Sequence, residues 1–265
     1  MPASPSSQAQ LSAIQDFVRG TQQLLPGEVR EIPEGWVVRS PSWPGLWMLN
    51  QVRVMTEVTY EQATELCRRY LSDASYDHLH VEDQDSGPAL VERFRREGWN
   101  VDVDLNSVLE GEPDRRVDTG AVIEPDEDEA LALMERWVTE DETLTLTPED
   151  LAHLMEANRV TWRVRGARRL GVRSSDGRLA AITMLFSDGR TGQVEDVYVV
   201  PEARGQGFGR MLVTRGIELA REGGHELTFI VADDNDWPKQ LYRRLGFDPI
   251  GRSWIFHRDL TASPG

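Results

Sequence analysis

Cysteine is almost absent from this chain of 265 residues, in which Cys67 is the only one. A single thiol cannot form a disulfide within the chain or hold a metal cluster built on cysteine. The five histidines are scattered without the spacing of metal ligands, so we expect no metal site. Cys67 lies in a stretch that is expected to be helical, residues 60–71, and we expect its side chain to be buried.

Long apolar runs are also missing. No stretch approaches the roughly 18 apolar residues that a membrane-spanning helix needs, and the chain does not open with the charged and then apolar pattern of a secretion signal. We therefore expect a cytoplasmic protein without a membrane partner.

Basic side chains are scarce as well. Lysine occurs once, as Lys239, beside 28 arginines, and the formal net charge of −16 argues against nucleic acid as a partner. The acid is concentrated in residues 121–158, which hold twelve acidic side chains and one basic side chain, Arg136. One explanation of this acidic segment is the preference of carboxylates for helix N-termini and for water.

The most informative stretch is a β-branched strand, a glycine-rich turn and the start of a helix, in that order. Glycines let the backbone turn sharply and approach a ligand closely, and the free N–H groups of a helix start point at an anion. The stretch therefore fits a pyrophosphate site, although a plain strand-to-helix connection would use the same glycines. The residues concerned are Val197, Tyr198 and Val199 in the strand, and Arg204, Gly205, Gln206, Gly207, Phe208, Gly209 and Arg210 in the turn.

Two other nucleotide-binding turns fit these residues poorly. A P-loop needs a lysine directly after its last glycine, and Lys239 is far from the turn. A dinucleotide-binding turn needs Gly-x-Gly-x-x-Gly and an acidic residue about 20 positions further on. Here the glycines alternate as Gly-x-Gly-x-Gly, and residues 221–224 at about that distance end a helix.

The pattern Arg204-x-x-Gly207-x-Gly209 after a Val-x-Val strand resembles motif A of the GNAT superfamily of acetyl-CoA-dependent N-acetyltransferases. A second segment, with Asn235 seven residues before Tyr242 and then Gly246-Phe247, resembles the family's motif B. The two matches cover about residues 121–260. The resemblance implies an α+β (α/β/α) fold, with a mixed, mostly antiparallel central sheet flanked by helices. It also implies acetyl-CoA as co-substrate and a primary amine as acceptor.

The resemblance further implies where acetyl-CoA binds. The backbone of Val197 and Val199 would align the pantetheine arm, and the turn from Gly205 to Arg210 would hold the pyrophosphate through main-chain N–H groups. Side chains at Gln206 and Phe208 should therefore matter little. Asn235 would either hydrogen-bond the pantetheine or cap the following helix.

Acetyl transfer to an amine needs a base for the ammonium proton and an acid for the departing thiolate. We expect Tyr242, a phenol with an ordinary pKa near 10, to be the acid, the alternative being a core aromatic. Some family members carry a glutamate where this chain has Ile230. We expect Glu195 to be the base instead, with deprotonation through water as the alternative. Asp196 should point to the opposite face of the strand.

The first half of the chain resembles a degenerate copy of the second. Aligning Gly98-Trp99 with Gly246-Phe247 sets Arg95-Arg96 on Arg243-Arg244 and puts Phe94 opposite Tyr242. No glycine turn like that of residues 204–210 precedes this segment in the first half. We expect a degenerate GNAT-like unit in residues 1–110, a linker in residues 111–120, and a catalytic unit in residues 121–265 with the one acetyl-CoA site. The alternative is an unrelated α/β domain.

Local patterns predict the remaining elements. In the first half they are helices over 8–25, 60–71 and 88–97 and strands over 35–40, 46–55, 78–82 and 100–109. In the second half they are two helices, an antiparallel meander over 168–173, 179–187 and 192–200, the motif A helix to Glu222, a strand, the motif B helix and a last strand near 252–260.

Two functions remain open at this stage. The first is an N-acetyltransferase that acts on a small cationic molecule or on a peptide or protein amine, in which the acidic segment forms a negative rim that attracts the amine. The second is a non-catalytic acyl-CoA-binding or regulatory module, which Ile230 and the degenerate first unit favour. The sequence does not decide between a monomer and a homodimer.

Overall fold

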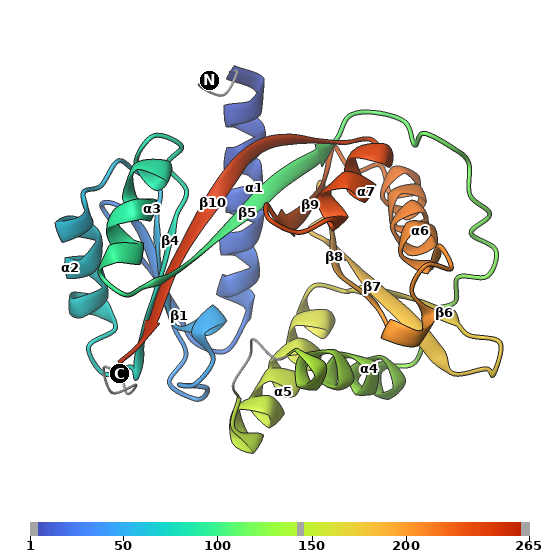
Figure 1. Ribbon diagram of the computed structural model, residues 1–265, viewed down its shortest axis with the longest axis horizontal. Coiled ribbons are helices and arrows are strands. Elements are labelled where there is room, and N and C mark those ends of the chain that lie inside the picture. The colour runs from blue at the N-terminus through green and yellow to red at the C-terminus, as the bar shows by residue number, and fades with distance from the viewer. Residues whose placement is uncertain (1–4, 142–145, 261–265) are drawn as a thin grey trace.

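The computed structural model describes residues 5–141 and 146–260, which form one sheet with helices on both faces (Figure 1). In the first half the elements are α1 (Pro5–Leu24), β1 (Glu28–Ile32), β2 (Gly35–Arg39), the short 3-10 helix η1 (Trp47–Leu49), β3 (Gln51–Val54), α2 (Tyr60–Tyr70), β4 (Tyr76–Val81), α3 (Ser86–Arg96) and β5 (Asn100–Leu109). In the second half they are α4 (Glu127–Glu140), α5 (Pro148–Val164), β6 (Arg168–Arg173), β7 (Leu179–Ser187), β8 (Thr191–Val199), the 3-10 helix η2 (Pro201–Ala203), α6 (Phe208–Glu222), β9 (Leu227–Asp233), α7 (Pro238–Arg244) and β10 (Phe247–Asp259).

The ten strands lie in the order β1-β2-β3-β4-β10-β5-β9-β8-β7-β6. Among the described strands only the neighbours β3 and β4, and β8 and β9, run parallel, so the expected mixed, mostly antiparallel sheet is confirmed. The strand that ends each half is exchanged: β10 lies between β4 and β5, and β5 lies between β10 and β9. The division into units 1–110 and 121–265 stays a prediction, but the sheet runs without a break across it.

The central pair of strands, β5 and β10, has an internal two-fold symmetry. The alignment of the two halves that places Gly98 on Gly246 also places Val103 on Gly251 and Asn106 on Trp254. In the sheet Val103 pairs with Trp254, and Asn106 pairs with Gly251. Replacing each residue of one pair by its counterpart in the other half therefore gives the other pair. This symmetry supports a repeated unit rather than a chance Gly-aromatic ending.

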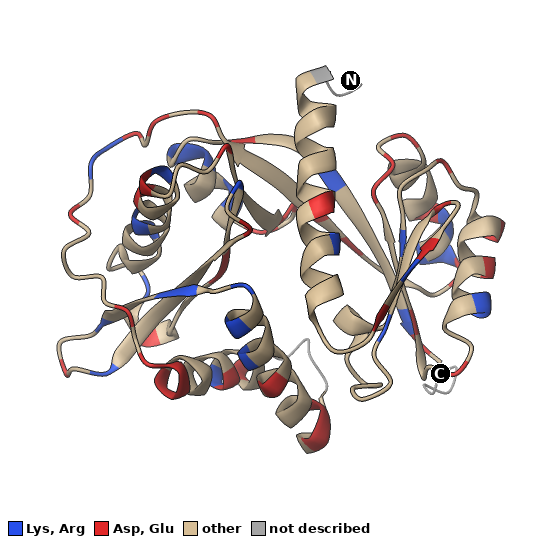
Figure 2. Ribbon diagram, turned by 180° about the vertical axis from the view of Figure 1, so that it is seen from behind, with Lys and Arg blue, Asp and Glu red and all other residues tan. Residues whose placement is uncertain are grey.

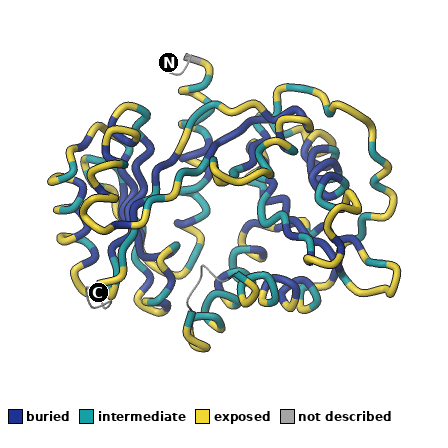
Figure 3. Tube along the Cα trace, viewed as in Figure 1, coloured by how far each residue is buried: buried dark blue, intermediate teal, exposed yellow. Residues whose placement is uncertain are grey.

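Three large apolar clusters fix which helices cover which face, and the strands between the helices are largely buried (Figure 3). Helices α2 and α3 pack on the first half of the sheet, and α6 and α7 pack on the same face of the second half. The opposite face is covered by α1, α4 and α5, where Phe17 of α1 meets Phe229 of β9 edge to face at 5.5 Å. Cys67 lies inside the α2 cluster at 1% exposure, as expected, and burial raises the pKa of its thiol.

Two local predictions in the first half were wrong. We missed the strand β1, most of whose residues are exposed or half-buried and give no alternating pattern. We also extended a strand over residues 46–50, which instead contain η1. The buried amide of Asn50 donates to the carbonyls of Trp43 and Leu46, at 2.9 and 3.0 Å, and holds this segment in a turn.

The segment that we expected to be a linker, residues 111–120, forms no helix or strand. It is nevertheless tied to α6. Asp114 pairs with Arg210 at 2.6 Å, Glu112 pairs with Arg221 at 2.9 Å, and Thr119 donates to Glu218 at 2.9 Å. The connection between the halves therefore follows the outer side of α6 (Figure 1).

A buried ion pair joins three strands to α1 beneath the centre of the sheet. Arg53 of β3 contacts Glu82 at 2.5 Å, and both side chains are less than one tenth exposed. The other oxygen of Glu82 accepts from Ser253 of β10 and from Gln15 of α1, at 2.5 and 2.9 Å. Each partner compensates the cost of burying the others away from water. Removing one member therefore leaves the remaining polar groups buried without a partner.

Replacing Arg53 with Met should lower the free energy of unfolding by about 3–5 kcal/mol, because it leaves the Glu82 carboxylate buried without a cation. Urea unfolding followed by circular dichroism measures this. The control is Arg178→Met, since the Arg178 side chain is 88% exposed and its removal should cost less than about 0.5 kcal/mol. Similar losses in both variants would contradict a specific role for the buried pair.

Candidate active site

An opening between β8 and β9 forms the centre of the candidate site. The two strands pair in parallel from Thr191 and Leu227 to Val194 and Ile230, and then separate although both continue. Strand β9 keeps its partner on the other side, β5, as far as Asp233. Residues 195–199 of β8 therefore face the opening without a strand partner from β9. Backbone N–H and C=O groups at such an edge are free to bind an extended ligand.

A β-bulge shapes the β8 side of this opening. Between the pairs Met184 with Glu195 and Ile182 with Tyr198, two residues of β8 stand opposite one of β7. Asp196 adopts a left-handed conformation there, with φ of 58°, and the Thr183 hydroxyl donates to the Glu195 carbonyl at 2.7 Å. A bulge interrupts the alternation of a strand. We expected the side chains of Glu195 and Asp196 to point to opposite faces of a regular strand. The bulge interrupts that regular alternation at Asp196.

The glycine turn ends at the open start of a long helix. Gly205 and Gly207 have φ of 78° and 85°, which a residue with a Cβ adopts only with strain, and both are exposed. Gly207 occupies the N-cap of α6, and no side chain caps this helix. The first N–H groups of α6 are thus left for an anion.

The first half has neither an opening between its parallel strands β3 and β4 nor an uncapped start of the helix α2 that follows β3. Helix α2 begins with a capping box, in which Thr59 and Gln62 each satisfy the other's backbone N–H. Strands β3 and β4 also stay together, because Val54 pairs with Val81 and accepts from the Glu82 N–H at 2.8 Å. Both the opening and the uncapped helix therefore belong to the second half.

The two arginines of the turn have different surroundings. Arg204 is exposed, and its Nε donates to the Val199 carbonyl at 3.2 Å, which keeps the side chain at the end of β8. Arg210 is 7% exposed and pairs with Asp114 of the linker segment, whose pKa it lowers. Any contact of Arg210 with a pyrophosphate would therefore rely on its main-chain N–H.

Tyr242 and Glu195, the predicted acid and base, come close enough to influence each other. Tyr242 lies on α7, is 7% exposed and meets Phe247 edge to face at 6.4 Å. Burial raises the pKa of its phenol, and the negative charges of Glu195 and Asp236 raise it further. The ordinary value near 10 that the sequence suggested therefore does not apply, and the phenol stays protonated at neutral pH.

Glu195 has an unusually basic carboxyl group. Burial raises its pKa to about 8, and the neighbouring carboxylate of Asp196 contributes to the rise. Gln193 donates a hydrogen bond to Glu195 at 2.5 Å, which opposes this rise in the pKa of Glu195. A carboxylate with this pKa is a stronger base than an ordinary glutamate, but it accepts a proton only in its ionised form, whose share grows as the pH approaches 8.

Asp104 and Asp233 form a feature of the site that sequence reasoning missed. They pair across β5 and β9, beyond the point where β8 leaves β9. Burial raises the pKa of Asp104 to about 6, and the charges of Glu82 and Asp233 add to this. The charge of Asp104 also acts on Glu195. No motif marks these residues, because only the strand exchange brings Asp104 beside the second half.

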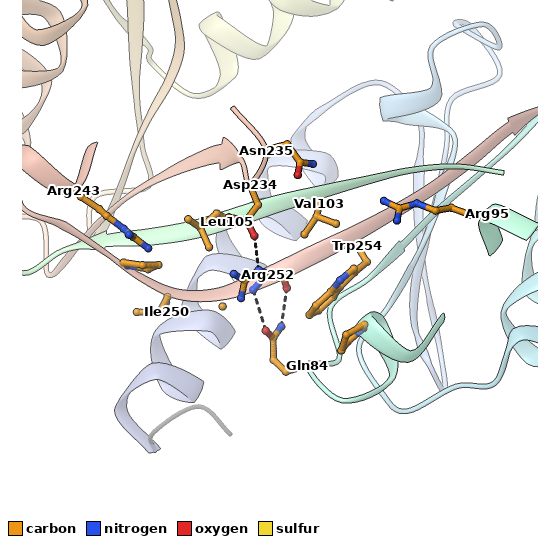
Figure 4. A pocket seen from close by; sticks show the side chains of 13 residues that line it. Gln84, Arg95, Val103, Leu105, Asp234, Asn235, Arg243, Ile250, Arg252 and Trp254 are labelled. Atoms are coloured by element: carbon orange, nitrogen blue, oxygen red, sulfur yellow. Dashed lines mark hydrogen bonds and ion pairs between the residues drawn. The ribbon is translucent and has the colours of Figure 1, made fainter. Parts of the chain in front are cut away.

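Asn235 does not cap the motif B helix, which removes one of its two expected roles. Helix α7 begins at Pro238, the cap position is Trp237, and no side chain caps it. The backbone N–H of Asn235 donates to Asp233 at 2.7 Å, and its side chain lines an open pocket beside β5 (Figure 4). Its proposed bond to pantetheine remains untested.

The acidic segment is less negative than its composition suggests. Figure 2 shows acidic residues along α4 and α5 with arginines among them. Glu127 pairs with Arg159 and Arg163, and Glu129 pairs with Arg173. Arg159 also contacts Asp128 at 3.0 Å and Glu156 at 3.7 Å, and these three residues line an open pocket of about 570 Å³ between α4 and α5 together with Glu135.

Tyr198, which we expected at the cofactor, points to α4 instead. Its hydroxyl donates to Glu140 at 2.6 Å, and its ring stacks on Trp137 with centroids 5.3 Å apart. Its side chain is thus engaged, and only its backbone faces the opening. In the part of the chain that the structure describes, no three metal-binding side chains gather, and no helix is long and apolar enough to cross a membrane.

Residues 131–247 match the model of the acetyltransferase (GNAT) family. The chain carries a GNAT acetyltransferase domain. This match begins inside α4 and ends at the first residue of β10, so it contains β8, the glycine turn, α6, β9 and α7. It therefore covers the opening between β8 and β9, the uncapped helix and the two predicted catalytic residues.

Curated relatives of this GNAT domain are similar over short stretches. A mycothiol acetyltransferase of Clavibacter sepedonicus is 38% identical over 82 residues, which are 31% of this chain and 27% of that protein. A thialysine N-epsilon-acetyltransferase of Bos taurus is 41% identical over 70 residues, which are 26% of this chain and 41% of that protein. The matched part thus spans less than half the length of these relatives.

Solved structures resemble this chain over most of its length. A GCN5-related N-acetyltransferase from Kribbella flavida superposes with a TM-score of 0.57 at 16% identity, covering 97% of this chain and 96% of that one. A conserved protein of unknown function from Staphylococcus epidermidis has a TM-score of 0.67 at 15% identity, covering 89% and 95%. At these identities the likeness concerns the fold alone, including that of the first half.

Replacing Gly209 with Ala should separate ligand binding from folding. An added Cβ would lie 3.7 Å from Val199, an ordinary contact, and alanine favours a helix over glycine by about 1 kcal/mol. The melting temperature should hold or rise. Coenzyme A affinity should fall roughly tenfold, because the methyl group keeps a pyrophosphate from the N–H groups of α6.

Isothermal titration with coenzyme A measures the effect, and Gln206→Ala is the control. Gln206 is exposed and should matter only through its main chain, so its variant should bind as the wild type does. Unchanged affinity in Gly209→Ala would contradict a pyrophosphate site at this turn.

Proposed function

We propose that this GNAT protein transfers the acetyl group of acetyl-CoA to the primary amine of a small cationic molecule or of a peptide or protein. The observation that supports it most is the opening between β8 and β9, with the uncapped start of α6 at one side and Tyr242 and Glu195 near the other. The GNAT match covers these same elements.

Acetyl-CoA fits this arrangement. The edge of β8 at Val197 and Val199, where Arg204 contacts the Val199 carbonyl, would hold the pantetheine arm, and the turn from Arg204 to Arg210 would hold the pyrophosphate. The left-handed glycines keep Cβ atoms away from that surface. Asn235, on the segment between β9 and α7, would add a hydrogen bond to the pantetheine.

The acceptor amine would approach from the face that α1, α4 and α5 cover. Glu195 lies on this face, because Gln193, two residues before it, pairs in register with Phe229, whose ring packs against Phe17 of α1. Asp104 and Asp233 lie on the same face of β5 and β9. A protonated amine there would be attracted by these carboxylates, and the negative potential would persist under the rim of α4 and α5.

Chemistry would follow from two proton transfers. Glu195 takes a proton from the ammonium group, directly or through water, so that the nitrogen lone pair can attack the thioester carbonyl. After the attack the nitrogen loses its second proton to solvent, and as the C–S bond breaks the Tyr242 hydroxyl donates to the sulfur. Tyr242 then recovers a proton from solvent, and Glu195 releases the one it took, so that one proton is released in net terms. The high pKa of Glu195 and the protonated phenol of Tyr242 suit these two roles.

A non-catalytic acyl-CoA-binding module is the second candidate. Ile230 occupies the place of the glutamate of some relatives, is 1% exposed and cannot accept a proton. Such a module would bind acetyl-CoA and release no thiol. A panel of amines, screened for coenzyme A release by a thiol reagent, separates the two functions.

Replacing Tyr242 with Phe should lower turnover on the order of a hundredfold, because the departing thiolate loses its acid. Acetyl-CoA affinity should stay within about twofold. Steady-state kinetics and calorimetry measure the two quantities, and the melting temperature checks that the buried ring still packs. Unchanged turnover would remove Tyr242 from the mechanism.

Replacing Glu195 with Gln should abolish the acidic limb of the pH–rate profile. The base must be ionised, so the wild-type kcat/KM should rise with pH and level off near the pKa of about 8. Profiles between about pH 6 and pH 10 measure this. Asp128→Gln is a control that removes a charge from the rim without touching the opening. A variant that keeps the wild-type limb would favour deprotonation through water alone.

A further inference from the structure

The centre of the sheet is covered on one face and open on the other. On the covered face α1 crosses β10, so closely that a Cβ on Gly251 would meet Leu11 at 2.7 Å. On the other face no helix of the described residues lies over β5 and β10 between α3 and α7 (Figure 1). An open pocket of about 600 Å³ occupies this place (Figure 4).

The pocket lies on the two-fold axis that relates β5 to β10. The shift that relates the halves takes Arg95 of α3 to Arg243 of α7, and both arginines line the pocket. Its walls are thus the matching ends of two equivalent helices. Its floor is the central β5 and β10 pair, where the two-fold axis passes.

The charge of the pocket is opposite to that of the chain. Three arginines line it, Arg95, Arg243 and Arg252, against one carboxylate, Asp234, in a protein of formal charge −16. Asp234 is already shared by Arg252 at 2.7 Å and Lys239 at 3.1 Å. The pocket therefore keeps a positive excess.

Two of these arginines are available to a ligand. The guanidinium of Arg95 has only a 3.8 Å contact with Glu92, and that of Arg243 has no ion pair or hydrogen bond within residues 5–141 and 146–260. A guanidinium presents a fork of donors that suits a carboxylate, sulfonate or phosphate. Arg252 is held in place by two backbone bonds to Gln84, at 2.7 and 2.9 Å (Figure 4).

The floor between the arginines is apolar. Val103 and Leu105 of β5 face the pocket together with Ile250 and Trp254 of β10. An apolar floor with a few convergent cationic groups is the usual composition of a site for a small organic anion. Free phosphate would use the arginines but leave this floor exposed to water.

We propose that the pocket between α3 and α7 binds an organic anion, a molecule with an apolar ring or chain and one or two carboxylate, sulfonate or phosphate groups. The pocket borders the proposed acetyl-CoA site at Asn235, but its arginines belong neither to the glycine turn nor to the opening between β8 and β9, and binding here does not depend on acetyl transfer. Its apolar part lies on the β5 and β10 floor, and its anionic groups contact Arg95 and Arg243.

The test uses 1-anilinonaphthalene-8-sulfonate, an aromatic anion whose fluorescence rises in apolar sites, titrated against the full chain. The double variant Arg95→Gln with Arg243→Gln should weaken its binding at least about fivefold. The matched control is Arg96→Gln with Arg244→Gln, which removes two exposed charges from the next positions of the same helices, outside the pocket. Its affinity should stay within about twofold of the wild type.

Two further measurements complete the test. The uncharged analogue N-phenyl-1-naphthylamine should bind all three proteins alike, because it lacks the sulfonate. Saturating coenzyme A should leave the difference between the two double variants in place. The proposal is overturned if the wild type gives no rise in fluorescence, if both double variants bind equally well, if the uncharged probe is weakened as the anion is, or if coenzyme A displaces the probe from all three proteins alike.

Discussion

The pairing of β5 with β10 is the constraint on which the rest of the structure depends. Each of these strands ends one half of the chain and lies among strands of the other, so neither half completes its share of the sheet alone. The ion pair of Arg53 with Glu82 and the crossing of α1 reinforce the same seam from behind. The open pocket and the carboxylates near Glu195 both derive their residues from this exchange.

Local chemistry was readable in the sequence because it depends on few neighbouring residues. The glycine turn, the motif B helix and the meander of β6, β7 and β8 lie where the residue patterns predicted them. The start of α6 required glycines for their left-handed conformation, and Asn235 to Tyr242 had a fixed spacing. Such features carry their physical cause within a short stretch.

Long-range contacts were not readable. Nothing in Asn100–Leu109 distinguishes a strand that closes its own half from one that crosses to the other, so Asp104 was not expected near Glu195. The bulge at Asp196 depends on the register with β7, and the turn at η1 depends on one buried amide, Asn50. The salt bridges that neutralise Glu127 and Glu129 likewise come from separate elements. Each of these features is decided by tertiary contacts that override local preference.

The position of β10 also orders events in time. It follows every other described strand in the sequence, yet it fills the gap between β4 and β5 at the centre of the sheet. During synthesis β4 and β5 therefore wait with unpaired edges until the final strand leaves the ribosome, which gives folding a high contact order and exposes the nascent chain to aggregation. A product that stops before Phe247 would lack this central strand and could not close the sheet.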